Sequence, residues 1–267
     1  MLNPAFLEAA SPIPSEASVR ELFSIPIDAM RMEQVLDRVD ETIVRRGRLQ
    51  IGVVNAAKIV NMRRNDLLRR SVLSSDLILA DGISVVWAGR LLGRPLPERV
   101  AGIDLMMGML RRGNERGYRL YCLGATEQVL DKVAARLAAD FPNIRQAGRQ
   151  NGSFPAEEEE AIAGRIAAAN PDILLVAMTS PKKEKFLARW SDRMGVPVCH
   201  GVGGSFDVFA GKVQRAPERW QRFGLEWLYR LKQEPRRLWR RYLTTNTVFC
   251  AMVVSEFLKR RPRTGAG

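Results

Sequence analysis

The sequence alternates short apolar runs with amphipathic segments, and this alternation restricts the fold more than any other feature. The apolar runs have the length of buried strands and lie at residues 22–28, 49–54, 77–80, 119–123, 173–178 and 196–199. Segments with helical periodicity lie between them, at residues 31–45, 56–68, 105–112 and 127–140. The runs predict five or six β units in a largely parallel sheet. We therefore expect an α/β, Rossmann-like fold in which helices flank the sheet.

The pattern changes after residue 211, where basic and aromatic helix continues without further strands. We expect three parts: a flexible leader at residues 1–20, an α/β core at 21–213, and a helical appendage at 214–267. The leader contains Glu8 and Glu16 and lacks the basic region and apolar core of a signal peptide. Since no run reaches the roughly 18 apolar residues of a spanning helix, we expect no membrane span.

The cysteine and histidine content argues against a metal centre. Cys122, Cys199 and Cys250 show no spacing typical of a disulfide framework or a metal site, which fits a reducing compartment such as the cytoplasm. His200 is the single histidine, and zinc sites usually need three or four such ligands. We expect no metal and no cofactor.

The charge is uneven along the chain. The net charge is +13, and residues 215–263 carry thirteen basic against four acidic side chains. This tail, which interleaves arginines with tryptophan, tyrosine and phenylalanine, predicts an anionic partner. Three interpretations stay open: an anionic membrane surface, nucleic acid, or a helix that packs on the core by its aromatic side chains.

Ligands of parallel sheets bind at the carboxyl ends of strands, which directs attention to the residues that follow the apolar runs. These residues are Asn55, Asp81, Gly124, Ser180 and Gly201. The carboxylate of Asp81 can face a ligand, and Gly82 beside it allows a close backbone approach. The alternatives are that Asp81 only accepts backbone hydrogen bonds in a turn and that Asn55 only caps the next helix.

Two further segments suit phosphate groups. Arg99, in the segment PERVAGID at residues 97–104, can bind a phosphate through two hydrogen bonds, or can be a surface arginine beside a capping Asp104. The loop GVGGSFD at residues 201–207 can direct backbone N–H groups at a diphosphate, although it does not match the GxGxxG pattern. Lys182, Lys183 and Lys185 bring ammonium groups to the same edge, or form the solvated start of a helix.

Four blocks of the sequence, in this order, resemble the WecG/TagA/CpsF family of glycosyltransferases. They are ILADG at 78–82, PERVAGIDL at 97–105, GVGGSFDVFAGKVQRAP at 201–217 and GLEWLYRLKQEPRRLWRRY at 224–242. The resemblance covers about residues 20–245. It implies transfer of a sugar, commonly of the N-acetylmannosamine type, from a UDP-sugar donor to a sugar on undecaprenyl diphosphate, with inversion and without a required metal. Such enzymes build bacterial cell-surface polysaccharides such as exopolysaccharides.

The resemblance also implies roles for individual residues. Asp81 matches the general base, and Asn55 matches a polar position across the pocket. Arg99 matches an arginine assigned to the donor's phosphates. The tail is expected to dock on the membrane and to contribute arginines that close the active site, for which the candidates are Arg215, Arg230 and Arg237. The remaining donor-binding candidates are Gly124, Lys183, Gly201, Gly203, Gly204 and Asp207.

Lys183 departs from the family pattern. The usual motif is glycine-x-proline-lysine-glutamine-glutamate, whereas residues 180–184 read SPKKE, so that Lys183 replaces the amide. Its ammonium group can pair with the diphosphate or with a carboxylate on the donor sugar. The donor is therefore left as an N-acetylmannosamine type, its uronic acid, or a hexose.

We thus predict an inverting, metal-independent glycosyltransferase of hexosyl or N-acetylhexosaminyl type. We expect it to be cytoplasmic and peripheral on the inner face of the plasma membrane, with nucleic acid not among its partners and self-association left open. Two non-catalytic alternatives remain at this point. One is a basic nucleotide- or nucleic-acid-binding protein, and the other is a structural partner of a polysaccharide synthase.

Overall fold

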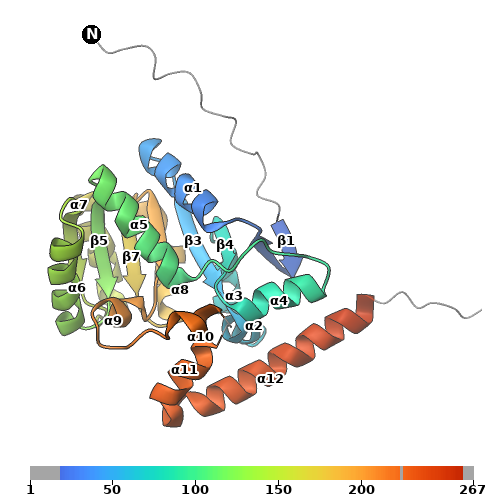
Figure 1. Cartoon of the computed structure of the whole chain (residues 1–267). Helices are drawn as coiled ribbons and strands as arrows, with labels where there is room; N and C mark the ends of the chain where they lie inside the picture. The colour runs from blue at the N-terminus through green and yellow to red at the C-terminus, as the bar shows by residue number, and fades with distance from the viewer. Residues whose placement is uncertain (1–18, 223–224, 261–267) are drawn as a thin grey trace, which may run out of the picture.

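The centre of the molecule is a six-stranded parallel sheet, which confirms the predicted α/β, Rossmann-like fold (Figure 1). The structure is a computed structural model, and it describes residues 19–222 and 225–260. The strand order across the sheet is β4-β3-β8-β7-β5-β6, and every neighbouring pair is parallel. The strands are β3 (Leu49–Val54), β4 (Leu77–Ala80), β5 (Arg119–Gly124), β6 (Arg145–Gln150), β7 (Ile173–Ala177) and β8 (Val198–Gly201).

Helices cover both faces of the sheet because the side chains of each strand alternate between two sets of buried apolar residues. One face carries α1 (Met32–Val44), α5 (Gly102–Arg116), α6 (Glu127–Asp140) and α9 (Ser205–Phe209). The other face carries α2 (Ala56–Met62), α3 (Asp66–Leu73), α4 (Ile83–Leu91), α7 (Glu159–Ala169) and α8 (Lys182–Met194). A short 3₁₀ helix, η2 (Ala156–Glu158), precedes α7.

The prediction of residues 22–28 as the first strand of the parallel sheet is wrong. Residues 22–28 do not join the parallel sheet, because the chain turns back at Phe23 and Ser24, whose φ angles are 55° and 57°. The result is an antiparallel hairpin of β1 (Val19–Leu22) and β2 (Ile25–Asp28). Positive φ at two successive residues is typical of tight hairpin turns. Except for Val19 and Arg20 in β1, the predicted leader lies outside the described residues.

Three other boundaries differ from the prediction. The segment expected as one helix at 56–68 is two helices, because Asn65 accepts a hydrogen bond from the amide of Leu68 and starts α3. Asp104 does not cap a helix, since α5 begins at Gly102. The predicted strand at 196–199 lies two residues further on, as β8. The sheet also contains a strand that apolar periodicity missed: β6 is polar, RQAGRQ, as suits an edge strand.

The tail is helical and packs on the core. It consists of α10 (Glu218–Arg222), α11 (Glu226–Gln233) and the long α12 (Pro235–Arg260), which runs below α2 and α4 in Figure 1. Phe249 and Met252 of α12 are buried in the same apolar cluster as α2 and β4. The ring of Phe249 also contacts that of Phe23 at 5.4 Å in an edge-on arrangement. The boundary between core and appendage at residue 213 stays a prediction.

No helix in the described ranges has the length and apolar character needed to cross a membrane. The exposed side of α12 nevertheless carries large apolar side chains. Trp239, Leu243, Val254 and Leu258 are each about half exposed or more.

The buried position of Phe249 predicts a large stability loss on truncation. We expect Phe249→Ala to lower the free energy of unfolding by roughly 3–5 kcal/mol, because it removes a buried ring and leaves a cavity. Urea denaturation measures this change. Leu258→Ala, on the exposed side of the same helix, is the matched control and should change stability by less than about 0.5 kcal/mol. Small and equal losses of stability in the two variants would show that α12 does not pack on the core.

Candidate active site

Asn55 and Asp81 meet at the carboxyl edge of β3 and β4. Nδ2 of Asn55 donates to Oδ2 of Asp81 at 3.3 Å, and Oδ1 of Asp81 accepts a 3.0 Å hydrogen bond from the amide of Gly102. Asn55 also caps α2, since its Oδ1 accepts from the amide of Lys58 at 3.0 Å. The capping role is thus confirmed, and the Asn55 amide group bonds Asp81 at the same time. These bonds fix the orientation of a half-buried carboxylate at the sheet edge.

His200 supports this arrangement, a role that differs from the metal ligation for which its residue type was considered. The side chain is fully buried, and its Nδ1 and Nε2 lie 3.3 Å from the carbonyl oxygens of Ile51 and Gly102 respectively. Burial lowers the pKa of His200 to about 4, which keeps the ring neutral at pH 7. The signal in the sequence was its place between the last predicted strand, at 196–199, and the glycine loop at 201–207. His200 therefore braces the segment that holds Asp81.

Lys183 is buried beside the glycine loop and does not belong to a solvated helix start. Its Nζ lies 3.7 Å from Oε1 of Glu184, and Nζ of Lys58 lies 3.0 Å from the same oxygen. Burial, and then the charge of Lys58, lower the pKa of Lys183 to about 8. Burial alone would raise the pKa of Glu184, but the charges of Lys58 and Lys183 outweigh it and lower that pKa. The cluster holds two cations and one anion.

The glycine loop lies against the Lys183 side chain. A Cβ added at Gly201 would come within 3.1 Å of Cε of Lys183, and one at Gly203 would lie 3.5 Å from its Nζ. Gly203 also has a φ of 53°, in the left-handed region that favours glycine. Around Gly204 there is open space for a Cβ. The structure thus brings Lys183 together with Gly201 and Gly203 of the predicted donor site, while a role of Gly204 stays a prediction.

Two predicted donor residues have other contacts. Asp207 of α9 pairs with Lys212, Oδ1 to Nζ, at 3.3 Å. Gly124 has a φ of 112°, and a Cβ there would lie 2.5 Å from the backbone of Ala177. Tight packing between β5 and β7 is therefore sufficient reason for glycine at this position. Donor binding by Asp207 and Gly124 stays a prediction.

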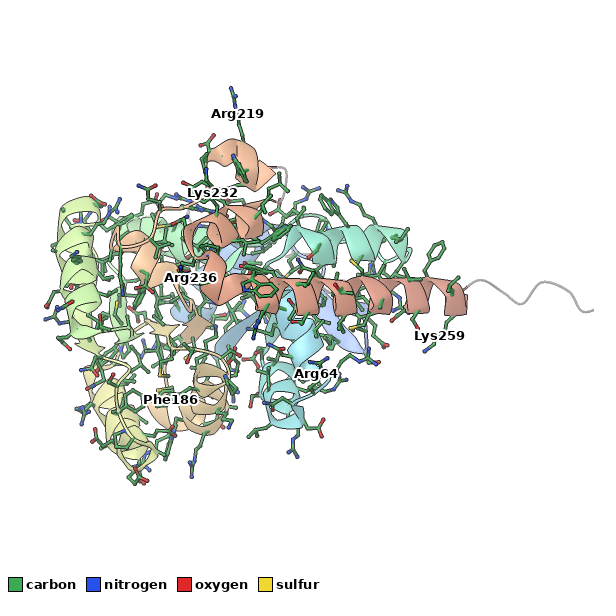
Figure 2. All side chains as sticks on the ribbon, turned by 90° about the horizontal axis from the view of Figure 1, so that it is seen from below. Arg64, Phe186, Arg219, Lys232, Arg236 and Lys259 are labelled. Carbon is green, nitrogen blue, oxygen red and sulfur yellow. The ribbon has the colours of Figure 1, made fainter. Side chains whose placement is uncertain are left out.

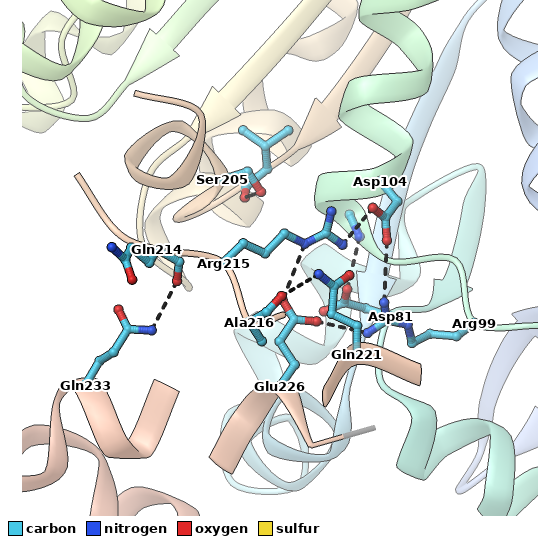
Figure 3. Close-up of polar contacts among 12 residues, drawn as sticks. Asp81, Arg99, Asp104, Ser205, Gln214, Arg215, Ala216, Gln221, Glu226 and Gln233 are labelled. Carbon is cyan, nitrogen blue, oxygen red and sulfur yellow. Dashed lines mark hydrogen bonds and ion pairs between the residues drawn. The ribbon is translucent and has the colours of Figure 1, made fainter. Parts of the chain in front are cut away.

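Arg99 lies in a network of four charged side chains that joins the core to the tail (Figure 3). Its Nη2 lies 3.4 Å from Oδ2 of Asp104, and its Nη1 lies 3.1 Å from Oε2 of Glu226. Arg215 contacts the same two carboxylates, with Nη2 2.7 Å from Oδ1 of Asp104 and Nε 3.9 Å from Oε1 of Glu226. The sequence did not predict the ion pair of Arg99 with the tail or a place for Glu226 in the site. Local sequence patterns carry no information on contacts between distant segments.

The other tail arginines do not join this network in the described structure. Arg230 is exposed on α11, and the side chain of Arg237 lies outside the described part of the chain. Figure 2 shows neighbouring basic side chains of the tail, Lys232 and Arg236, and Lys259 at the far end of α12. Within residues 19–222 and 225–260, no three histidine, cysteine or carboxylate side chains are grouped so that they could hold a metal ion.

Comparisons with known proteins match the chain to one family over most of its length. The model of the glycosyl transferase WecG/TagA/CpsF family matches residues 20–263. An N-acetylglucosaminyldiphosphoundecaprenol N-acetyl-beta-D-mannosaminyltransferase of Bacillus spizizenii is 40% identical over 193 residues, which cover 72% of this chain and 74% of the relative. A protein of the same name from Bacillus subtilis is 40% identical over 171 residues, or 64% of this chain and 66% of the relative.

The cost of burying Lys183 predicts a pH-dependent stability gain when it is removed. We expect Lys183→Met to be more stable than the wild type at pH 7 by roughly 3 kcal/mol, since one pKa unit corresponds to about 1.4 kcal/mol. The unfolded chain, in which the pKa is near 10.5, binds this proton more tightly than the folded chain, where it is about 8. Wild-type stability from this group therefore rises between pH 8 and 10.5, and the gain should shrink over that window.

Urea denaturation at pH 7 and pH 10 measures this difference. Lys185→Met removes the same charge from an exposed position on the same helix and should show neither effect. A Lys183→Met protein that is less stable than the wild type at pH 7 would contradict the proposed cost of burial.

Proposed function

The chain belongs to the glycosyltransferase WecG/TagA/CpsF family and is a glycosyltransferase, and on this premise we propose the reaction that it catalyses. It transfers a sugar of the N-acetylmannosamine type, its uronic acid or a hexose from a UDP donor to a sugar on undecaprenyl diphosphate. The names of the relatives support the acceptor and the class of sugar. Family membership sets aside the two non-catalytic alternatives. The pathway is assembly of a bacterial cell-surface polysaccharide.

The observation that carries this mechanism is the oriented carboxylate of Asp81 at the carboxyl edge of the sheet. Asp81 accepts the proton of the acceptor hydroxyl as its oxygen forms a bond to the anomeric carbon of the donor. The bond from that carbon to the diphosphate oxygen breaks, and UDP leaves with the electron pair. One base opposite the leaving group is sufficient for inversion. Asn55 holds the carboxylate through its amide group.

The leaving UDP needs positive charge, which this chain supplies from its own residues. Arg99 and Arg215 can bind diphosphate oxygens through their guanidinium groups. Lys183 supplies a buried cation beside Gly201 and Gly203, and its Nζ is 3.5 Å from a Cβ position on Gly203. Buried cations act more strongly on a developing negative charge than solvated ones. These charges support departure of UDP without a metal ion.

We place the enzyme on the cytoplasmic face of an anionic membrane, held there by the tail. The supporting observation is that α12 has two apolar sides. Phe249 and Met252 face the core, whereas Leu243, Val254 and Leu258 are more than half exposed. Arginines and lysines flank this exposed side in sequence, as in helices that lie at an anionic lipid surface.

The role of Asp81 predicts a selective loss of chemistry in Asp81→Asn. The amide keeps the shape of the carboxylate but cannot accept the proton, so transfer should fall by about 10²- to 10⁴-fold. The measurement is UDP release from a panel of UDP-sugars with a prenyl-diphosphate-linked acceptor. UDP affinity, measured by calorimetry, should stay within about twofold and serves as the control for folding. Full activity of Asp81→Asn would remove this residue from the mechanism.

The exposed side of α12 predicts the effect of charge on membrane binding. Truncation of the tail is a poor test, because it removes Phe249 and Met252 from the core. We expect Leu243→Glu with Leu258→Glu to weaken binding to phosphatidylglycerol vesicles at least tenfold, since carboxylates at the contact repel anionic lipid. Vesicle sedimentation measures it.

Val44→Glu with Leu67→Glu, at exposed apolar residues of α1 and α3, makes the same charge change, is the control and should bind vesicles nearly as the wild type does. Equal loss in both proteins would point to net charge alone, and no loss in either would exclude α12 as the docking surface.

A further inference from the structure

The carboxylate of Glu226 lies between two arginines of the site, as Figure 3 shows. Its Oε2 is 3.1 Å from Nη1 of Arg99, and its Oε1 is 3.9 Å from Nε of Arg215. The side chains of Arg99 and Glu226 are only 18% and 17% exposed, so solvent screens their attraction in part. Guanidinium groups bind carboxylate and phosphate oxygens with the same fork of donors. Glu226 therefore occupies a position that also suits a phosphate.

The network of Arg99, Asp104, Arg215 and Glu226 is balanced, with two positive and two negative charges. Arg99 already contacts a carboxylate through each of its terminal nitrogens. Nε and Nη2 of Arg215 are buried and make their carboxylate contacts without an aligned hydrogen bond. A diphosphate added to this balanced network would face two carboxylates a few ångströms away, and like charges at such separations repel. Departure of one carboxylate removes this repulsion and frees N–H donors of Arg99 for a phosphate.

Glu226 is the carboxylate that can leave without disturbing the core. Asp104 belongs to α5, which is anchored by buried side chains such as Met106. In contrast, α11 has no buried residue among those described. Its aromatic contact between Trp227 and Tyr242, with ring centroids 5.7 Å apart, lies within the tail itself. The helix that carries Glu226 can therefore shift without unpacking a buried side chain, whereas Asp104 cannot.

We propose that the Glu226 carboxylate occupies the place of the donor's diphosphate in the free protein, as a stand-in for it. This inference rests on the UDP donor proposed above. In the free protein the carboxylate pairs with Arg99 and Arg215, which keeps two partly buried cations compensated. When the diphosphate binds, its oxygens take the place of the carboxylate and Glu226 moves away with α11. The amide of Val100 donates to the carbonyl oxygen of Ala80 at 2.9 Å, so Arg99 precedes and Asp81 follows directly paired backbone, and the exchange occurs close to the base.

The exchange links the donor site to the tail. If the diphosphate and Glu226 compete for the same arginines, donor binding weakens the hold of α11 on the core. By thermodynamic linkage, anything that draws α11 away strengthens donor binding by the same factor. Glu226 therefore acts as a positioning residue for the arginines and as a competitor of the donor, with no part in the chemical step.

Calorimetric titration with UDP tests the exchange. Glu226→Gln removes the competing charge, and we expect it to bind UDP about tenfold more tightly than the wild type, in keeping with a partly screened ion pair. Glu218→Gln makes the same charge change at an exposed position of α10 and should bind as the wild type does. Equal or weaker binding by Glu226→Gln would overturn the stand-in role and leave Glu226 as a structural link between tail and core.

Hydrogen exchange on the unmodified protein provides a second readout that does not depend on a variant. Saturation with UDP should speed exchange of the backbone amides of residues 226–233, because α11 loses its contact with the arginines. Slower or unchanged exchange in a protein that binds UDP would overturn the stand-in alone. A wild-type protein that binds no UDP would overturn the proposed donor and the stand-in together.

Discussion

The hydrogen bond from the amide of Gly102 to the carboxylate of Asp81 is the contact on which the reactive edge depends. It ties the residue that follows β4 to the first turn of α5, so that one carboxylate stays fixed outside the sheet. Two other groups maintain it: the Asn55 amide group bonds the second carboxylate oxygen, and His200 lies 3.3 Å from the carbonyl oxygen of Gly102. Because the His200 ring is buried and neutral, it adds no charge beside the base.

Burial of charged side chains around this edge lowers the stability of the folded protein. Lys183 is buried with only a 3.7 Å contact to Glu184, and its lowered pKa reflects that desolvation. Arg99 is compensated by a carboxylate from the tail. A diphosphate gains most from these cations once a carboxylate such as that of Glu226 has left them, because like charges repel at such short distances. The tail thus packs on the core through Phe249 and contacts the site through Glu226.

The sequence predicts most of the fold, because buried parallel strands read as apolar runs and their carboxyl ends share one edge. That rule alone predicts that Asn55 and Asp81 lie together. It failed at β6, whose edge position needs no apolar run, and at Phe23 and Ser24, where the backbone reverses within an apolar segment. The ion pair of Arg99 with Glu226 joins residues far apart in the chain, and local patterns carry no information on such contacts. The burial of Lys183 depends on tertiary packing in the same way.

The central claim is a single displacement at the anomeric carbon, with Asp81 as the base on the side opposite the departing UDP. The most direct measurement is the anomeric configuration of the product, determined by proton NMR after turnover of a UDP-sugar with a prenyl-diphosphate-linked acceptor. Attack from the opposite side predicts a glycosidic bond whose configuration is inverted relative to the donor. A product that retains the donor's configuration would contradict the mechanism, since retention requires two displacements or an attack from the side of the leaving group.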